Sequence, residues 1–252
     1  MKKKKISVDL SQLRAAGLNH QLSNLMQLIK YAYHNDFYLI PPLFKLSGKH
    51  NHGNEICSNL SDYFNFNDIK VEGKKYLLCD QPPSSNLLSL SYIPEKKDND
   101  LLQNHSLFSK LTDISVEIPI HPSLKKISEK VYESLKDYTC VHVRRSDRLN
   151  QTKECTKPSN ILKNVKKFNC KKVYIMTDEK QFDFFKPLIK NNNFDFFFAK
   201  DFGLNTIKDN YKVFLIEQEI MKLASYRVSC LRWPSWANYD SYLCKSKPWN
   251  WK

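Results

Sequence analysis

The segment from His142 to Asp147 combines an imidazole, two guanidinium groups and a carboxylate within six residues that read His-Val-Arg-Arg-Ser-Asp. Alternation along an extended strand puts His142 and Arg144 on the same face. A guanidinium binds a phosphate through two parallel hydrogen bonds, whereas a lysine acts only as a point charge. One of Arg144 and Arg145 can therefore bind an anion while Asp147 orients the other. The alternative is a strand end that carries a surface ion pair.

Two more apolar runs end in polar groups. The run that ends at Met176 is followed by Asp178 and Glu179, which also fit the start of a helix. The run that ends at Leu231 is followed by a proline, then by Ser235 and Trp236. A helix that starts there presents free backbone N–H groups and a hydroxyl to an anion, and a tryptophan can stack against a sugar.

Glu219 lies on the helix predicted before that last run, three residues after Ile216 and four before Leu223. This spacing puts its carboxylate close to the apolar stripe of the helix. A carboxylate in that position needs a partner, and a ligand is one option.

The elements that must position these residues lie in a regular second half. Apolar periodicity predicts helices and strands in alternation, which favours a doubly wound, mostly parallel sheet whose ligands bind beyond the carboxyl ends of its strands. The predicted helices are 122–136, 158–168, 181–190, 211–225 and 235–244, and the predicted strands are 138–143, 172–176, 194–199 and 226–231. In the first half we expect strands over 6–10 and 37–40 and a helix over 18–32, followed by an irregular stretch. The domain boundary is expected between residues 120 and 121.

Composition narrows the classes of protein and of partner. The chain has 252 residues, of which 41% are hydrophobic, and its net charge of +14 favours anionic partners: phosphates, nucleic acid, acidic glycans or a membrane surface. Its five glycines match neither GxG nor GxxxxGK[ST], so the two common phosphate loops are excluded as patterns. No apolar run is long enough for a transmembrane segment.

The cysteines and histidines predict neither a disulfide framework nor a metal site. Seven cysteines, an odd number without a CxxC pair, fit reduced thiols in a cytoplasmic protein. His50 and His52 form a pair without a third ligand nearby in sequence. We therefore expect no metal and no cofactor.

Taken together, these motifs resemble the fucosyltransferase superfamily that uses GDP-fucose, which includes the protein O-, α1,2- and α1,6-fucosyltransferases and the nodulation enzymes. The residues from His142 to Asp147 match its H-x-R-R-x-D motif, and the strand that ends in Thr-Asp-Glu looks like its second motif. The segment 16–22 is similar to its N-terminal motif, with His20 in place of the usual asparagine. Glu219 and, sixteen positions later, Ser235 fall where the family has an acid and a serine-rich phosphate loop.

The resemblance implies an α/β, GT-B-like fold with two Rossmann-like halves: residues 1–120 on the acceptor side and 121–252 binding the nucleotide sugar. It also implies an inverting, metal-independent transfer of fucose from GDP-fucose to a glycan or protein acceptor. Arg144 would hold the β-phosphate, and Asp178 and Glu179 are candidate bases. The implied donor-binding residues are His142, Arg144, Arg145, Asp147, Glu219, Ser235, Trp236, Gly17, Asn19 and Gln21.

Other functions remain open. The donor can be another nucleotide deoxy-sugar or a pentose such as rhamnose or xylose, and Thr152 stands where the α1,6 branch has an acid. A related chain that binds the nucleotide sugar without transferring it is a further alternative. The charge of +14 also motivates a nucleic-acid-binding protein. No helix-turn-helix, RNP or zinc-finger pattern accompanies that charge, so we expect no nucleic-acid partner.

Overall fold

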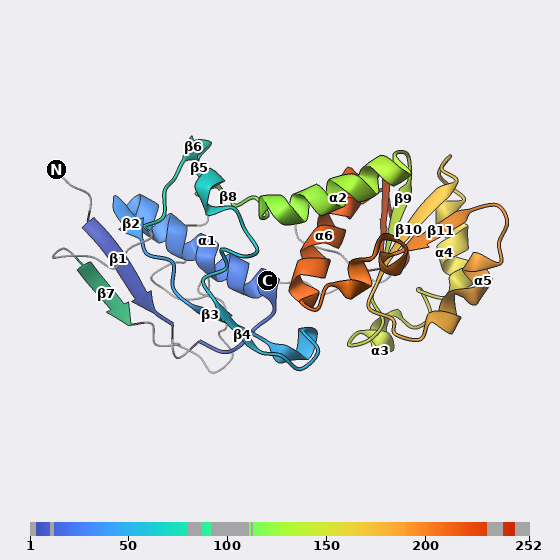
Figure 1. Cartoon of the computed structure of the whole chain (residues 1–252), viewed down its shortest axis with the longest axis horizontal. Coiled ribbons are helices and arrows are strands. Elements are labelled where there is room, and N and C mark those ends of the chain that lie inside the picture. Colours follow the sequence, from blue (N-terminus) through green and yellow to red (C-terminus); the bar gives the residue numbers. More distant parts are fainter. Residues whose placement is uncertain are drawn as a thin grey trace. The chain divides into compact units, whose positions relative to one another are not determined.

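The computed structural model of the chain describes residues 4–10, 13–79, 87–91, 111, 113–230 and 239–244 (Figure 1). The chain divides into two compact units. The first comprises Met1–Leu124 and Asp209–Tyr211, and the second comprises Lys125–Lys208 and Lys212–Lys252. Among the described residues, no helix combines the length and the apolar character needed to cross a membrane.

The first unit contains a three-stranded parallel sheet of order β2-β1-β7. The helix α1 (Leu18–His34) connects β1 (Lys4–Asp9) to β2 (Phe37–Leu39) and buries one apolar face, which confirms the helix and strands predicted here. β7 is Leu87–Ser91. The irregular stretch forms short elements: β3 (Phe44–Leu46), η1 (Gly48–His50), β4 (Ile56–Ser58), η2 (Phe66–Asp68), β5 (Lys70–Val71), β6 (Lys74–Lys75) and β8 (Val116–Glu117).

The second unit is built on a five-stranded sheet of order β11-β10-β9-β12-β13, in which every neighbouring pair is parallel. The strands are β9 (Thr139–Val143), β10 (Lys172–Thr177), β11 (Asp195–Phe198), β12 (Tyr226–Ser229) and β13 (Ser241–Tyr242). The helices are α2 (Pro122–Leu135), α3 (Leu149–Thr152), α4 (Pro158–Val165), α5 (Lys186–Ile189) and α6 (Asn210–Leu223), with 3-10 turns η4 (Phe182–Phe185), η5 (Ala199–Phe202) and η6 (Leu204–Thr206). The first residues of α2 and of α6 belong to the first unit. The predicted doubly wound sheet is confirmed.

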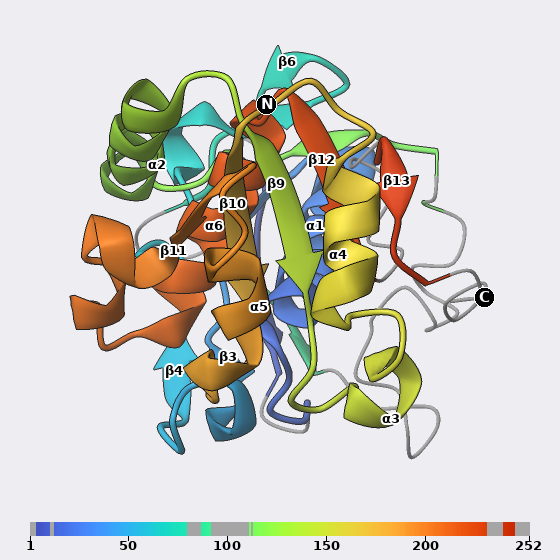
Figure 2. The same cartoon turned by 90° about the vertical axis from the view of Figure 1, so that its right-hand side faces the viewer.

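Helices cover both faces of this sheet, and Figure 2 shows α2 and α4 on opposite sides of β9. Alternate residues of the strands, such as Val141 and Ile175, form an apolar core with Ile161 of α4 and Leu188 of α5. The intervening residues of each strand turn to the other face of the sheet. On that face the hydroxyl of Tyr138, the residue before β9, donates to the Ile220 carbonyl of α6 (2.5 Å).

Two details of the predicted elements are wrong. The helix expected over 235–244 is absent from 239–244, where β13 pairs with Val228 and Ser229 of β12 instead. Tyr239, Leu243 and their neighbours have a helix-like spacing, but pairing with a strand distant in sequence decides the structure. The helix expected over 181–190 is divided into η4 and α5.

Candidate functional site

The carboxyl ends of β9, β10 and β12 meet at one edge of the sheet, because β9 lies between the other two and all three are parallel. The hydroxyl of Thr177 donates to the Val143 carbonyl (2.8 Å), and the backbone N–H of Arg144 donates to Cys230 Sγ (3.1 Å). The segments that follow these strands are therefore neighbours. This is the edge at which a doubly wound sheet binds its ligands.

Arg144 lies at this edge with its guanidinium held by Asp147. Its Nε and Nη2 donate to the two carboxylate oxygens at 2.8 and 2.7 Å, and the side chain is 26% exposed. Burial opposes the charge of Arg144, but hydrogen bonding and attraction to Asp147 and the nearby Asp178 raise its pKa above the usual value. Nη1 has no hydrogen-bond partner among the described residues. The cation is thus permanent and fixed in orientation, and it retains a donor for an anion.

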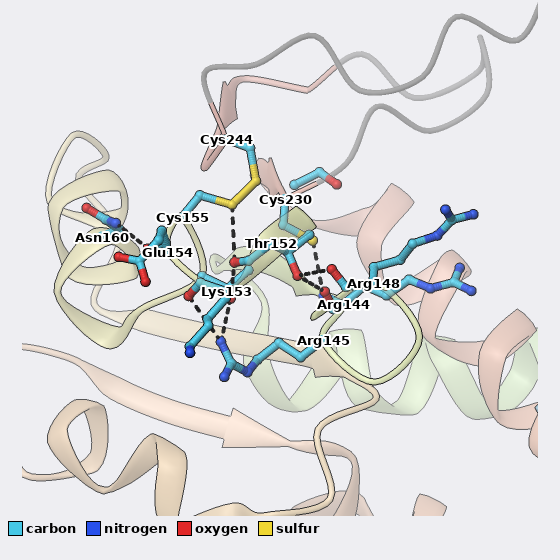
Figure 3. Close-up of a disulfide and its surroundings, with 12 residues drawn as sticks. Arg144, Arg145, Arg148, Thr152, Lys153, Glu154, Cys155, Asn160, Cys230 and Cys244 are labelled. Carbon is cyan, nitrogen blue, oxygen red and sulfur yellow. Dashed lines mark hydrogen bonds between the residues drawn. A yellow bond between two sulfur atoms is a disulfide. The ribbon is translucent and has the colours of Figure 1, made fainter. Parts of the chain in front are cut away.

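Arg145 turns the other way and its side chain is only 10% exposed. Its Nε donates to Glu179 (2.9 Å), its Nη1 donates to the Thr156 hydroxyl (2.8 Å), and its guanidinium carbon lies 3.8 Å from the centre of the Phe184 ring. Figure 3 shows Arg145 reaching toward Lys153, whose carbonyl accepts a longer bond from the same Nη1 (3.4 Å). The two adjacent arginines therefore have different partners and different exposure.

Asp178 ties the segment after β10 to the segment after β9. Its Oδ1 accepts from the backbone N–H of Arg145 (2.6 Å) and its Oδ2 from that of Ser146 (3.3 Å). The hydroxyl of Ser146 donates in turn to the Asp178 carbonyl (2.6 Å). Since these N–H groups already bond to a carboxylate, the side chain of Arg144 is the better placed donor for an incoming anion.

His142 lies on β9, two residues before Arg144, and is 4% exposed. Its Nδ1 lies 3.1 Å from the Ser229 hydroxyl of β12. Burial, with a smaller effect from the charge of Arg144, lowers the pKa of His142 to about 3. The imidazole is neutral at physiological pH and acts as a polar group, not as a second cation.

The two glutamates of α6 differ in their surroundings. Glu219, the predicted ligand, pairs with Lys222 one turn along the helix, and its side chain is 16% exposed. Glu217 was missed by the sequence analysis: it is 7% exposed and accepts from the Tyr174 hydroxyl (2.9 Å). Burial is the main reason why the pKa of Glu217 is raised to about 8. Leu223, which placed the apolar stripe in the sequence analysis, is exposed. The buried side of α6 instead includes all four residues from Leu215 to Gln218, so the adjacent pair Leu215 and Ile216 is the sequence signal for the burial of Glu217.

Three predicted donor-binding residues lie in the first unit, at the start of α1. Gly17 is the residue before the helix, with an extended backbone, and Asn19 is in its first turn. Gln21 is fully buried, and its side-chain amide donates to the carbonyls of Arg14 (3.2 Å) and Lys45 (2.8 Å). Its amide N–H groups thus connect the segment before α1 to the strand β3.

Two further candidates, Ser235 and Trp236, which the sequence predicts as phosphate and sugar contacts, lie outside the described residues. In the part of the chain that is described, no group of three or more His, Cys, Asp or Glu side chains is arranged to hold a metal ion.

A disulfide joins Cys155 to Cys244 beside the arginine segment (Figure 3). The prediction that all the cysteines are reduced thiols is therefore wrong for this pair. The two residues are 89 positions apart, and sequence spacing carries no sign of their pairing. The parallel order β9-β12-β13 brings the segment after β9 and the end of β13 to the same edge. Disulfides are typical of oxidising compartments, so the cytoplasmic location stays a prediction.

No protein-family model matches the chain, and none of the curated proteins matches its sequence. Solved structures do share its fold. The fucosyltransferase NodZ from Bradyrhizobium is 12% identical with a TM-score of 0.51, over 90% of this chain and 88% of that one. POFUT1 in complex with GDP-fucose is 10% identical with a TM-score of 0.55, over 90% of each chain. POFUT1 in complex with GDP is also 10% identical, with a TM-score of 0.53 over 91% of each chain. The predicted α/β, GT-B-like fold is thereby confirmed.

Proposed function

We propose that this chain is a glycosyltransferase that binds a nucleotide sugar, with GDP-fucose as the donor and a glycan or protein hydroxyl as the acceptor. The observation that carries the proposal is the position of Arg144. It is a fixed, partly exposed cation that follows the central strand of a parallel sheet, where such folds bind phosphates. The shared fold with proteins solved with GDP and GDP-fucose supports the choice of donor.

The proposed reaction inverts the configuration of the sugar. The acceptor oxygen forms a bond to the anomeric carbon from the face opposite the diphosphate. The bond between that carbon and the β-phosphate oxygen breaks, and the diphosphate leaves with the electron pair. The acceptor proton passes to a base. Arg144 stabilises the charge that develops on the departing diphosphate, and its fixed orientation lets it do so without reorganisation.

We propose that this fixed charge lets the transfer proceed without a metal ion. A bound divalent cation often neutralises a leaving diphosphate, and Arg144 offers a permanent charge for the same purpose. Transfer measured in EDTA should then equal transfer in buffer. Activity that is lost in EDTA and returns with Mn²⁺ or Mg²⁺ would contradict this part of the proposal.

The test of the donor is a thermal-shift panel of GDP, UDP, ADP and their sugars. A ligand that binds only the folded chain raises its melting temperature. We expect the largest shift with GDP and GDP-fucose, and a weaker or absent shift with the other nucleotides. A larger shift with UDP, or with a donor that carries rhamnose or xylose, would mean that GDP-fucose is not the donor. Salt-sensitive binding to DNA or RNA that exceeds binding to GDP would favour the nucleic-acid class instead.

Two arginine variants locate the site within the sheet. Arg144→Ala should lose the GDP shift. Arg227→Ala is a matched control, because Arg227 is 29% exposed and faces Asp240 in an ion pair near the start of β12. It should keep the shift. Equal loss in both variants would mean that the response reflects net charge and not a site at Arg144.

A further inference from the structure

Arg145 is linked to three segments that surround the Arg144 loop (144–148). Glu179 lies after β10, Thr156 lies after α3, and Phe184 belongs to η4. These contacts use the Nε edge, one Nη nitrogen and a face of the guanidinium. A phosphate that approached Arg145 through its remaining nitrogen, Nη2, would have to reach a side chain that is only 10% exposed.

Glu179 is engaged to the same degree. One of its oxygens accepts from Arg145 (2.9 Å) and the other from the backbone N–H of Gln181 (2.9 Å). Burial opposes the charge of Glu179, but these hydrogen bonds and the attraction of Arg145 lower its pKa below the usual value. A carboxylate stabilised in this way accepts a proton poorly, so it is badly suited to be the base.

We propose that Arg145 and Glu179 are positioning residues: their ion pair holds the Arg144 loop in the geometry that binds the diphosphate, and neither side chain touches the donor or the acceptor. This inference rests on the proposed function. It changes the roles expected from the sequence, in which Arg145 is a donor ligand and Glu179 a catalytic residue. Arg144 keeps the contact with the phosphate.

The physical basis is that a bound anion tolerates little displacement of its donor. A displacement of about 1 Å can cost roughly 100-fold in rate, even when every reacting group is present. Arg144 and Arg145 are also adjacent like charges, and the carboxylate of Glu179 offsets the charge of Arg145. Removing Glu179 therefore both frees the loop and adds repulsion.

The first experiment compares Arg145→Met, Glu179→Leu and the double variant. Each single variant leaves one buried charge without its partner and should lower the melting temperature by roughly 10 °C. Each should also weaken GDP binding at least tenfold, measured by calorimetry well below its melting temperature. The double variant replaces the pair with apolar groups, and a methionine packs well against the Phe184 ring. Its melting temperature should recover, and its affinity for GDP should return to within about threefold of the wild type.

The results separate three roles. If the double variant regains its stability but binds GDP more than tenfold more weakly than the wild type, Arg145 contacts the donor and the proposal is overturned. If the folded single variants bind GDP as the wild type does, the pair is only structural and the proposal is again overturned. The matched control is Lys186→Met/Asp183→Leu, an exposed ion pair of the same unit, which should change neither property.

Glu179→Gln gives an answer even if the double variant does not fold. If Glu179 is a positioning residue, removing its charge by this substitution should weaken GDP binding about three- to tenfold. If Arg145 were a donor ligand, losing the competing carboxylate would leave binding equal or tighter, which would overturn the proposal.

Hydrogen exchange of the ligand-free chain separates this inference from the proposed function. Both single variants should speed exchange at residues 144–148, and the double variant should restore slow exchange. If the wild type binds no nucleotide, the proposed function fails while this measurement still tests the hold on the loop. Unchanged exchange in both single variants would overturn the inference.

Discussion

The two faces of the five-stranded sheet bury different chemistry. Toward α4 and α5 the contacts are apolar, from Val141 and Ile175 to the buried ring of Phe185. Toward α6 the sheet carries polar and titratable groups, and the contacts include the bond from Tyr174 to Glu217. One face therefore contributes mainly apolar packing. The other buries polar groups at a cost in desolvation and includes His142, just before the candidate site.

Removing a ring from the apolar face should have the largest effect on stability. Phe185→Ala deletes a fully buried side chain that packs against Phe198 (5.3 Å between ring centres). The free energy of unfolding should fall by about 3–5 kcal/mol, because transfer and cavity terms add. Denaturant unfolding measures the change. Ile189→Ala, at an exposed position of α5, is the control and should change stability little; a similar loss there would show that the apolar face is not specifically packed.

Opening the disulfide between Cys155 and Cys244, which both pack against the apolar core, should have the next largest effect on stability. The reason is that a cross-link over 89 residues restricts the unfolded chain. Cys155→Ser should therefore reduce the free energy of unfolding by about 2–4 kcal/mol. The effect should vanish when wild type and variant are compared under reducing conditions. Cys57→Ser removes an exposed free thiol and serves as the control. A variant as stable as the wild type under oxidising conditions would argue that the two thiols are not joined.

A change on the polar face should appear as a change in pH dependence. The pKa of Glu217 is raised to about 8 in the folded chain, where burial is the main cause and Tyr174 and Asp178 are nearby. Its unfolded pKa is near 4.3. Between these values the folded chain binds the extra proton, so this carboxyl makes stability fall as pH rises through that window. Below the window its contribution is fully present.

Glu217→Gln keeps an acceptor for Tyr174 but cannot ionise. Relative to the wild type, it should gain roughly 2–4 kcal/mol between pH 5 and pH 8. Urea unfolding at several pH values measures this slope. Glu129→Gln, on the exposed surface of α2, is the comparison and should leave the slope as it is. Parallel slopes for Glu217→Gln and the wild type would contradict the ionisation assigned to the polar face.

The fold was largely predictable from the sequence because local and tertiary preferences agree in the second unit. Apolar runs such as 173–176 are bounded by polar residues and are buried within strands, and α4 begins at Pro158 as expected. Where pairing distant in sequence decides, the prediction failed. β13 is held by two residue pairs with β12, and Cys155 finds a partner 89 residues away.

The candidate site was predictable as a set of neighbours but not as a set of roles. Strand ends in a parallel sheet must share an edge, so the approach of the Arg144 loop to Asp178 and Glu179 follows from the order of the strands. Which arginine turns inward depends on Thr156 and Phe184, whose positions are tertiary. On α6, Glu217 and Glu219 are two residues apart, and only the packing against Tyr174 distinguishes them.

The most direct test of the account is the rate of fucose transfer by Arg144→Ala, measured as kcat/KM for GDP-fucose with Arg227→Ala as the control. Arg144→Ala should lose roughly 10²–10³-fold in kcat/KM, the cost of removing one preorganised charge, with an unchanged melting temperature. Arg227→Ala should stay near the wild-type rate. Wild-type transfer by folded Arg144→Ala would contradict the claim that this guanidinium stabilises the departing diphosphate.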